Sequence, residues 1–219
     1  MNEQEWMTCH EPIRMWAWLQ SRRGLLRRFA QWFGTVYWMP RRKELLFATG
    51  YCRATRFAWS SEHENVLRAA EEYVDQPRRF NGKLARDCQL AYYLPMIFLD
   101  WEHESMQRAA HYNPVMADET LRSFVDQCGL FCNVFRDVFH NDFVATCKNN
   151  FNFGTEHEGA ISTMAAAIYR DGTFDRLPML ADLIEGSDCD CREDLCAHCR
   201  LPGPHVRGCW VLDRLLGKD

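Results

Sequence analysis

The sequence predicts an all-α protein, and three observations lead to that prediction. Apolar residues recur at intervals of three and four along most of the chain, which is the period of an amphipathic helix. Strict alternation of apolar and polar residues, which marks strands, is nearly absent. Pro, Gly and Asn cluster where the helical patterns stop. These features favour an irregular helical bundle or short helical array with a C-terminal helix-turn-helix tail.

The clearest helical pattern runs from Leu121 to Phe139. Its apolar residues form one stripe, and we expect this helix to lie in the core. Similar but shorter patterns predict further helices at residues 12–20, 24–38, 42–58, 62–75, 83–110, 158–170, 176–185, 193–200 and 206–216.

Polar and repeated segments suggest how the chain is divided. The run KNNFNFGTEHEG at residues 148–159 predicts a linker between a helical domain, 1–147, and a C-terminal helical subdomain, 160–219. The segments EHENVLRAA and EHESMQRAA begin forty residues apart and match at six of nine positions. They are either a repeat or simply two amphipathic helices with similar starts.

The composition indicates a globular chain with reduced thiols. The 219 residues are 47% hydrophobic, which is enough for a core, and include 11 cysteines. Disulfide scaffolds are typical of short secreted chains, and the first residues do not resemble a secretory signal. No apolar run is long enough for a transmembrane helix, so we expect a cytoplasmic protein.

A basic, tryptophan-rich segment is the best candidate for a contact surface. The chain up to Ser60 holds ten Lys or Arg and four acidic residues, a net charge of +6, whereas the whole chain carries −4. Arg and Trp anchor protein interfaces, and they also grip unpaired bases or a membrane surface. Trp at helical spacing can equally be core. The candidate binding residues are Arg22, Arg23, Arg27, Arg28, Trp32, Trp38, Arg41, Arg42 and Lys43.

Catalytic motifs receive little support. The tripeptide Glu-His-Glu occurs at residues 62–64, 102–104 and 156–158, and imidazole and carboxylate groups are the ligands of hydrolytic metals. Adjacent helical residues point in different directions, however, and H-E-x-x-H is absent. Nucleophile elbows and phosphate-binding glycine loops are absent as well. We therefore predict no catalytic residues.

The tail offers a candidate zinc site. Cys196, Cys199, His205 and Cys209 form a C-x2-C-x5-H-x3-C array, close to a zinc knuckle, in which His205 comes one residue late. The same stretch reads as two amphipathic helices around the turn LPGPH, and thiols on such faces need no metal.

The tail also resembles that of a large paralogous family of uncharacterised planctomycete proteins. The resemblance is carried by FDRLPMLADLIEG from Phe174 and by PGPHVRGCW from Pro202, and upstream by FRDVFHNDF from Phe135. It implies that the basic stretch near residues 21–40 is an insertion and that Cys196 is not a general feature. The ligand set it implies is Cys189 or Cys191 with His198, His205 and Cys209, holding zinc or only a helix turn. The resemblance implies no activity.

The sequence thus favours a non-enzymatic interaction or regulatory module that binds a protein partner through its basic, tryptophan-rich segment. The first alternative is a small accessory subunit of a nucleic-acid-binding complex, for example a defence-related one. The second is a metal-dependent hydrolase built from His and Glu residues. The cofactor expectation is none, or zinc at Cys189, His198, His205 and Cys209.

Overall fold

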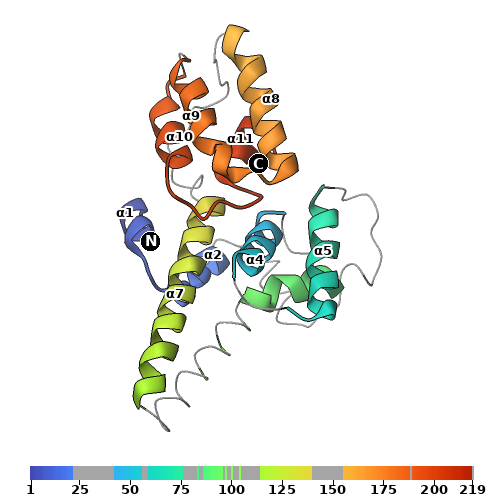
Figure 1. The fold of residues 1–219 in the computed structure, drawn as a ribbon, viewed down its shortest axis with the longest axis vertical. Coiled ribbons are helices and arrows are strands. Elements are labelled where there is room, and N and C mark those ends of the chain that lie inside the picture. Colours follow the sequence, from blue (N-terminus) through green and yellow to red (C-terminus); the bar gives the residue numbers. More distant parts are fainter. Residues whose placement is uncertain are drawn as a thin grey trace. The chain divides into compact units, whose positions relative to one another are not determined.

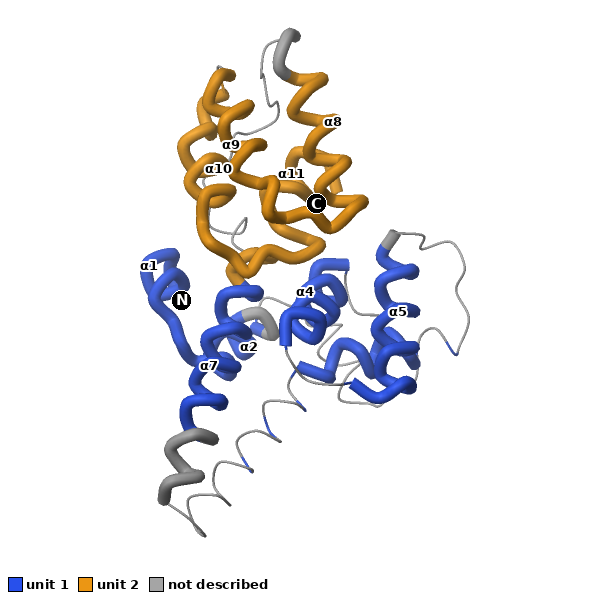
Figure 2. Tube along the Cα trace, viewed as in Figure 1, with its two compact units in different colours: residues 1–135 blue, residues 136–219 orange. Residues whose placement is uncertain are grey.

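A computed structural model gives the fold of the chain. It describes residues 1–21, 42–55, 59–75, 83, 86–95, 97, 100, 104, 114–139, 155–187 and 189–218. Within these ranges the regular structure consists of helices and no strand, which confirms the all-α prediction (Figure 1). The chain divides into two compact units, Met1–Phe135 and Arg136–Asp219 (Figure 2).

Unit 1 begins with two short helices, α1 (Glu3–Thr8) and α2 (Pro12–Ser21). The sequence patterns did not predict α1, because six residues are too few to show a period. A capping box holds its start: Asn2 Oδ1 accepts from Glu5 N at 2.8 Å, and Asn2 N donates to Glu5 Oε2 at 2.9 Å. The residues Asn2 and Glu5 were therefore the local signal for this helix.

Helices α4 (Arg42–Ala54) and α5 (Ser61–Asp75) pack together in unit 1. Arg53 near the end of α4 binds carboxylates on α5, with 3.0 Å from Nε to Glu71 Oε1 and a short contact to Glu64. The predicted helix 42–58 ends at Ala54. Its free end is satisfied by side chains, since Cys52 O accepts from Thr55 Oγ1 at 2.8 Å and from Trp59 Nε1 at 2.9 Å.

Aromatic residues form the core of unit 1. Phe47 of α4 meets Phe131 and Phe135 of α7 (Pro114–Phe139) edge to face, with ring centroids 4.8 Å apart in both pairs. Trp6 joins them at 5.3 Å from Phe135 and is fully buried. Edge-to-face pairs of this kind add stability beyond the area they bury.

The apolar stripe on α7 is buried only in part. From Phe131 onward its apolar side chains are buried, as expected for a core helix. Leu121 and Val125, by contrast, are 46% and 57% exposed, and Phe124 and Cys128 are half-buried. The prediction of a core helix is therefore right for its second half and wrong for residues 121–128.

In the described part of unit 2, four helices follow the last turn of α7. They are α8 (Thr155–Asp171), α9 (Leu177–Glu185), α10 (Arg192–Cys199) and α11 (Trp210–Leu215), with a short 3-10 turn, η2 (Phe174–Arg176), before α9. Helix α9 packs against both α8 and α10, and α11 packs against α8. Their shared core includes the fully buried side chains of Ile168, Leu180, Ile184 and Leu212.

Two boundaries differ from the sequence expectation. Residues 155–159, which were assigned to a linker, form the start of α8, and the division between the units falls at Phe135 and Arg136. The last helix was expected from residue 206 but begins at Trp210. Gly208 has φ +95°, a backbone conformation that a helix cannot contain, so the apolar pattern extends beyond the helix itself. The expected helix 24–38 lies outside the described residues.

Leu180 and Met179 provide a matched test of the core of unit 2. Leu180 is fully buried, so Leu180→Ala is expected to lower the free energy of unfolding by about 2–5 kcal/mol, through lost burial and the cavity it leaves. Met179 lies next to Leu180 on the same helix and is 56% exposed. Met179→Ala is therefore expected to change the free energy of unfolding by less than about 0.5 kcal/mol. Urea unfolding measures both. Equal losses would contradict the packing described for α9.

Candidate functional site

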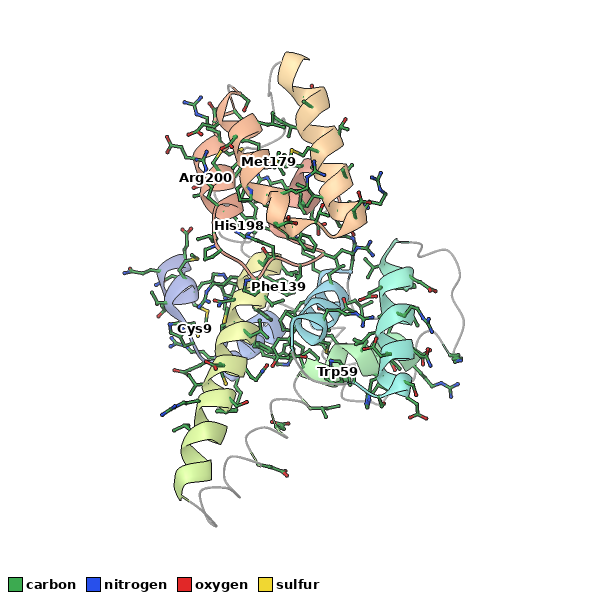
Figure 3. All side chains as sticks on the ribbon, viewed as in Figure 1. Cys9, Trp59, Phe139, Met179, His198 and Arg200 are labelled. Atoms are coloured by element: carbon green, nitrogen blue, oxygen red, sulfur yellow. The ribbon has the colours of Figure 1, made fainter. Side chains whose placement is uncertain are left out.

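Four potential metal ligands meet inside unit 2. Asp137, His198, His205 and Cys209 each present one ligand atom, and these atoms all lie within 4.8 Å of one another. Asp137 lies in the last turn of α7, His198 on α10, His205 in the turn after α10, and Cys209 at the N-cap of α11. Figure 3 labels His198 on α10 and Phe139 at the end of α7. We call these four residues the polar cluster.

The turn LPGPH places His205 in the polar cluster. Gly203 has φ +87°, and a Cβ atom built there would lie 3.0 Å from His205 N. A side chain at this position would be strained by the backbone and would also crowd the backbone of His205. The turn thus needs glycine, and it brings His205 Nε2 to 3.1 Å from Leu201 O.

Asp137 is the centre of the polar cluster. Its Oδ1 lies 2.9 Å from His198 Nε2 and 2.7 Å from His205 Nδ1, and its Oδ2 accepts from Val206 N at 2.9 Å. Burial, the largest effect, opposes the charged form, but the hydrogen bonds from His198 and His205, with the positive charge of His205, outweigh it and lower the pKa of Asp137. A carboxylate that is 3% exposed is thereby kept ionised.

Trp210 fixes the protonation of His198. The indole Nε1 of Trp210 can only donate, and it lies 2.9 Å from His198 Nδ1. Nδ1 must therefore be the unprotonated nitrogen, which leaves the single proton on Nε2, facing Asp137. His198 is consequently a neutral donor to Asp137.

Within the polar cluster, His205 is the histidine that is positively charged. Both of its ring nitrogens face oxygen acceptors, Nδ1 toward Asp137 and Nε2 toward Leu201 O, so both must be protonated. Burial, the largest effect, opposes this charge, but the hydrogen bond and charge of Asp137 prevail and raise the pKa of His205. Asp137 and His205 thus form a buried ion pair without net charge.

Cys209 completes the group as an uncharged thiol. It is fully buried, and its Sγ lies 3.2 Å from His198 Nε2. Burial, followed by the charge of Asp137, raises the pKa of Cys209 well above its usual value. The sulfur therefore acts as a weak acceptor beside the His198 proton rather than as a thiolate.

The donor types suit zinc, but this arrangement is that of a hydrogen-bonded group. Zinc–nitrogen bonds of about 2.0 Å in a tetrahedron place neighbouring N and O ligand atoms about 3.3 Å apart. Asp137 Oδ1 is 2.7 and 2.9 Å from its two histidine nitrogens, which are hydrogen-bond distances. A metal on His198 Nε2 would also move the ring proton to Nδ1, against the Trp210 N–H. The polar cluster has the donor types to hold a metal ion, and binding one would require these hydrogen bonds to separate.

The same geometry does not form a catalytic triad. A Cys-His-Asp triad needs the thiol on one ring nitrogen and the carboxylate on the other. Here Cys209 and Asp137 both lie against Nε2 of His198, while Trp210 occupies Nδ1. No proton can pass through the imidazole from the thiol to the carboxylate, and the sulfur is sealed from solvent.

The structure brings together three of the four ligands suggested from the tail. His198, His205 and Cys209 converge, but Asp137 takes the fourth place. Cys189 is not in the group; its Sγ lies 2.9 Å from that of Cys191. The alternative knuckle array is not assembled among the described residues. Cys199 is fully buried, and the Cys196 thiol donates to Ala181 O at 3.3 Å.

The basic, tryptophan-rich segment falls largely outside the described residues. Arg42 and Lys43 open α4 and are half-buried, and the other predicted contact residues are not described: Arg22, Arg23, Arg27, Arg28, Trp32, Trp38 and Arg41. Of the three Glu-His-Glu tripeptides only residues 62–64 are described in full. His63 Nδ1 there bonds Ser60 Oγ at 2.7 Å, and Glu64 pairs with Arg53.

Sequence reasoning missed Asp137 and the role of Trp210. Asp137 is a carboxylate within the apolar end of the α7 pattern, which was the available signal. Its partners lie 61 to 69 positions further along the chain, so no local spacing reveals them.

The comparisons with known proteins supply no relative. No protein-family model matches the chain, no curated protein matches it, and no solved structure matches it. In the part of the chain that the structure describes, no helix has both the length and the apolar character needed to cross a bilayer.

Asp137→Asn tests the buried ion pair. The amide keeps the shape but leaves the His205 charge without its partner, so the free energy of unfolding is expected to fall by about 3–5 kcal/mol. Asp182→Asn removes an exposed carboxylate that pairs with Arg200, and here a loss of at most about 1 kcal/mol is expected. Thermal and urea unfolding measure both variants. A similar small loss in both would show that the ion pair contributes little.

Proposed function

We propose that the protein is a non-enzymatic interaction or regulatory module that binds a protein partner. The observation that carries this proposal is the exposed half of the apolar stripe on α7, where Leu121 and Val125 are 46% and 57% exposed. Apolar side chains at helical spacing that face solvent are typical of contact surfaces. We call this surface, made of Leu121, Phe124, Val125 and Cys128, the α7 apolar face.

A groove in unit 1 supports the same reading. It has a volume of about 730 Å³ and is lined by His10 together with α7 residues from Phe124 to Asn133, including Val125 and Cys128. A groove beside an apolar helix face suits an apolar segment of a partner, which would add its own side chains to the stripe. The predicted partner is therefore a protein with an amphipathic helix or extended apolar segment.

The polar cluster serves as an internal support in this proposal. Its donors and acceptors pair with one another, and three of its members are at most 8% exposed. A buried, satisfied network of this type favours one arrangement of the helices around it. It offers neither an open metal position nor an accessible nucleophile, which weighs against the hydrolase alternative.

The cellular location of the protein and its family membership are also proposals. We propose a cytoplasmic protein, since its thiols are best kept reduced there. We also propose membership of the planctomycete family, whose tail pattern includes the positions of His198, His205 and Cys209. Most of the basic, tryptophan-rich segment lies outside the described residues, so the nucleic-acid alternative becomes an outcome of the test below.

Val125→Asp tests the partner surface. The side chain is mostly exposed, so the variant is expected to fold, and a charge on the α7 apolar face is expected to weaken partner binding at least tenfold. Ser123→Asp is the matched control: it adds the same charge two residues away on the same helix, on a different side, and is expected to bind as the parent does. Proximity labelling in the native host, followed by titration of the captured partner, gives the measurement.

Three outcomes would count against this function. Capture that is equal for Val125→Asp and the parent would exclude the α7 apolar face. Capture that disappears after nuclease treatment and weakens steeply with salt would favour the nucleic-acid alternative. Hydrolytic activity of the purified protein would favour the enzyme.

Zinc content tests the role of the polar cluster. Zinc remains the alternative occupant, and it would require Trp210 to release His198 Nδ1. Because the hydrogen bonds are complete without a metal, we expect well under one zinc per chain, in the parent and in Cys209→Ser alike. Protein purified without chelators and analysed for metals decides this. Stoichiometric zinc that is lost in Cys209→Ser would overturn the hydrogen-bonded assignment.

A further inference from the structure

A second group of sulfur atoms lies in unit 2, outside the polar cluster. Cys189 Sγ and Cys191 Sγ are 2.9 Å apart, in the link between α9 and α10. A disulfide bond is about 2.05 Å long, so the two sulfurs are less than about 1 Å from bonding distance. They are separated in sequence by the exposed Asp190 alone.

The local backbone explains this approach. Arg192 N donates to Cys189 O at 3.1 Å, which closes a turn over residues 189–192. The turn draws its first and fourth residues together, so the chain from Cys189 to Cys191 is more compact than an extended chain would be. Arg192 Nη1 also bonds Ser187 O at 3.1 Å, and so fastens the link to the start of α10.

Cys191 lies at the start of α10. It is the N-cap residue of this helix, with Asp190 before it and Arg192 after it. Cys191 and Cys189 are 6% and 4% exposed, whereas Cys199 and Cys209 are fully buried. Burial raises the pKa of Cys199 to about 12. Cys196 is exposed to a similar extent (5%), so the feature that sets the pair apart is the 2.9 Å distance between its two sulfur atoms.

We propose that Cys189 and Cys191 form a reversible intramolecular disulfide and that this pair is a redox modification site. The oxidant is a small disulfide such as oxidised glutathione. The Cys191 thiolate attacks one of its sulfurs, forming a mixed disulfide and releasing one glutathione thiolate. Cys189 then loses its proton to solvent and attacks Cys191 Sγ, which releases the second glutathione. Two protein thiols become one disulfide, and the small disulfide becomes two thiols.

Oxidation would act on the link between α9 and α10. Both sulfurs belong to the apolar core of unit 2, and α9 and α10 share the most extensive helix contact described for it. Closing a ring over Asp190 would restrict the turn that joins these helices. The expected consequence is a local change in the α9–α10 link, with the polar cluster left intact.

Peptide mapping of the whole protein tests the proposal. The protein is equilibrated with oxidised glutathione under native conditions, alkylated with iodoacetamide, digested with trypsin and analysed by mass spectrometry. Cleavage after Arg176 and Arg192 gives peptide 177–192, in which Cys189 and Cys191 are the only cysteines. We expect this peptide to be two hydrogens lighter than its reduced form, without alkylation, and to recover both alkylation sites after dithiothreitol.

The neighbouring peptide is an internal control. Peptide 193–200 holds Cys196 and Cys199, which are expected to remain thiols in the same sample. In Cys189→Ser the reaction should stop at the mixed disulfide, leaving glutathione on Cys191, whereas Cys196→Ser should still close the ring.

Three results would overturn the assignment. The first is alkylation of both Cys189 and Cys191 after oxidation. The second is a disulfide that joins either residue to another cysteine. The third is glutathione that persists on the parent protein. Because the parent protein alone gives these readouts, a variant that fails to fold leaves the decision unchanged.

Discussion

The buried carboxylate of Asp137 needs hydrogen bonds and an opposite charge, and several segments of unit 2 supply them. Moving a charge such as that of Asp137 out of water is costly unless hydrogen bonds and an opposite charge replace the water. The chain meets this requirement with His198, His205 and the Val206 amide, which come from α10 and the turn that follows it. The course of the chain from α10 to α11 is therefore arranged around this one side chain.

Periodicity predicted the longer helices well, because burial of one face is a property of the sequence itself. Residues 12–20, 62–75 and 176–185 were assigned to within two residues of α2, α5 and α9. The pattern failed where local backbone geometry decides the structure. A capping box fixes the start of α1. The positive φ angle of Gly208 prevents a helix at that residue, so α11 begins only at Trp210. Periodicity also cannot tell whether a partner exists for an apolar face, as residues 121–128 of α7 demonstrate.

The candidate site was predictable only where its residues are close in sequence. His198, His205 and Cys209 lie within twelve residues, and their types suggested a common site. Asp137 joins them through tertiary packing, which spacing does not reveal. Its presence also changes the chemistry, because a carboxylate in place of Cys189 allows an ion pair with His205. The residue types alone suit both a metal site and a hydrogen-bonded group. The two are distinguished by which atoms donate and which accept hydrogen bonds.

The Trp210 hydrogen bond to His198 has an evolutionary consequence. Each member of the network satisfies another, so the loss of any single one leaves a buried donor, acceptor or charge without its partner. An aliphatic replacement of the entire set could be tolerated, whereas most intermediates between the two states would be unstable. We therefore expect four positions to be conserved or substituted together among homologues: Asp137, His198, His205 and Trp210. This coupling spans 73 positions of the sequence.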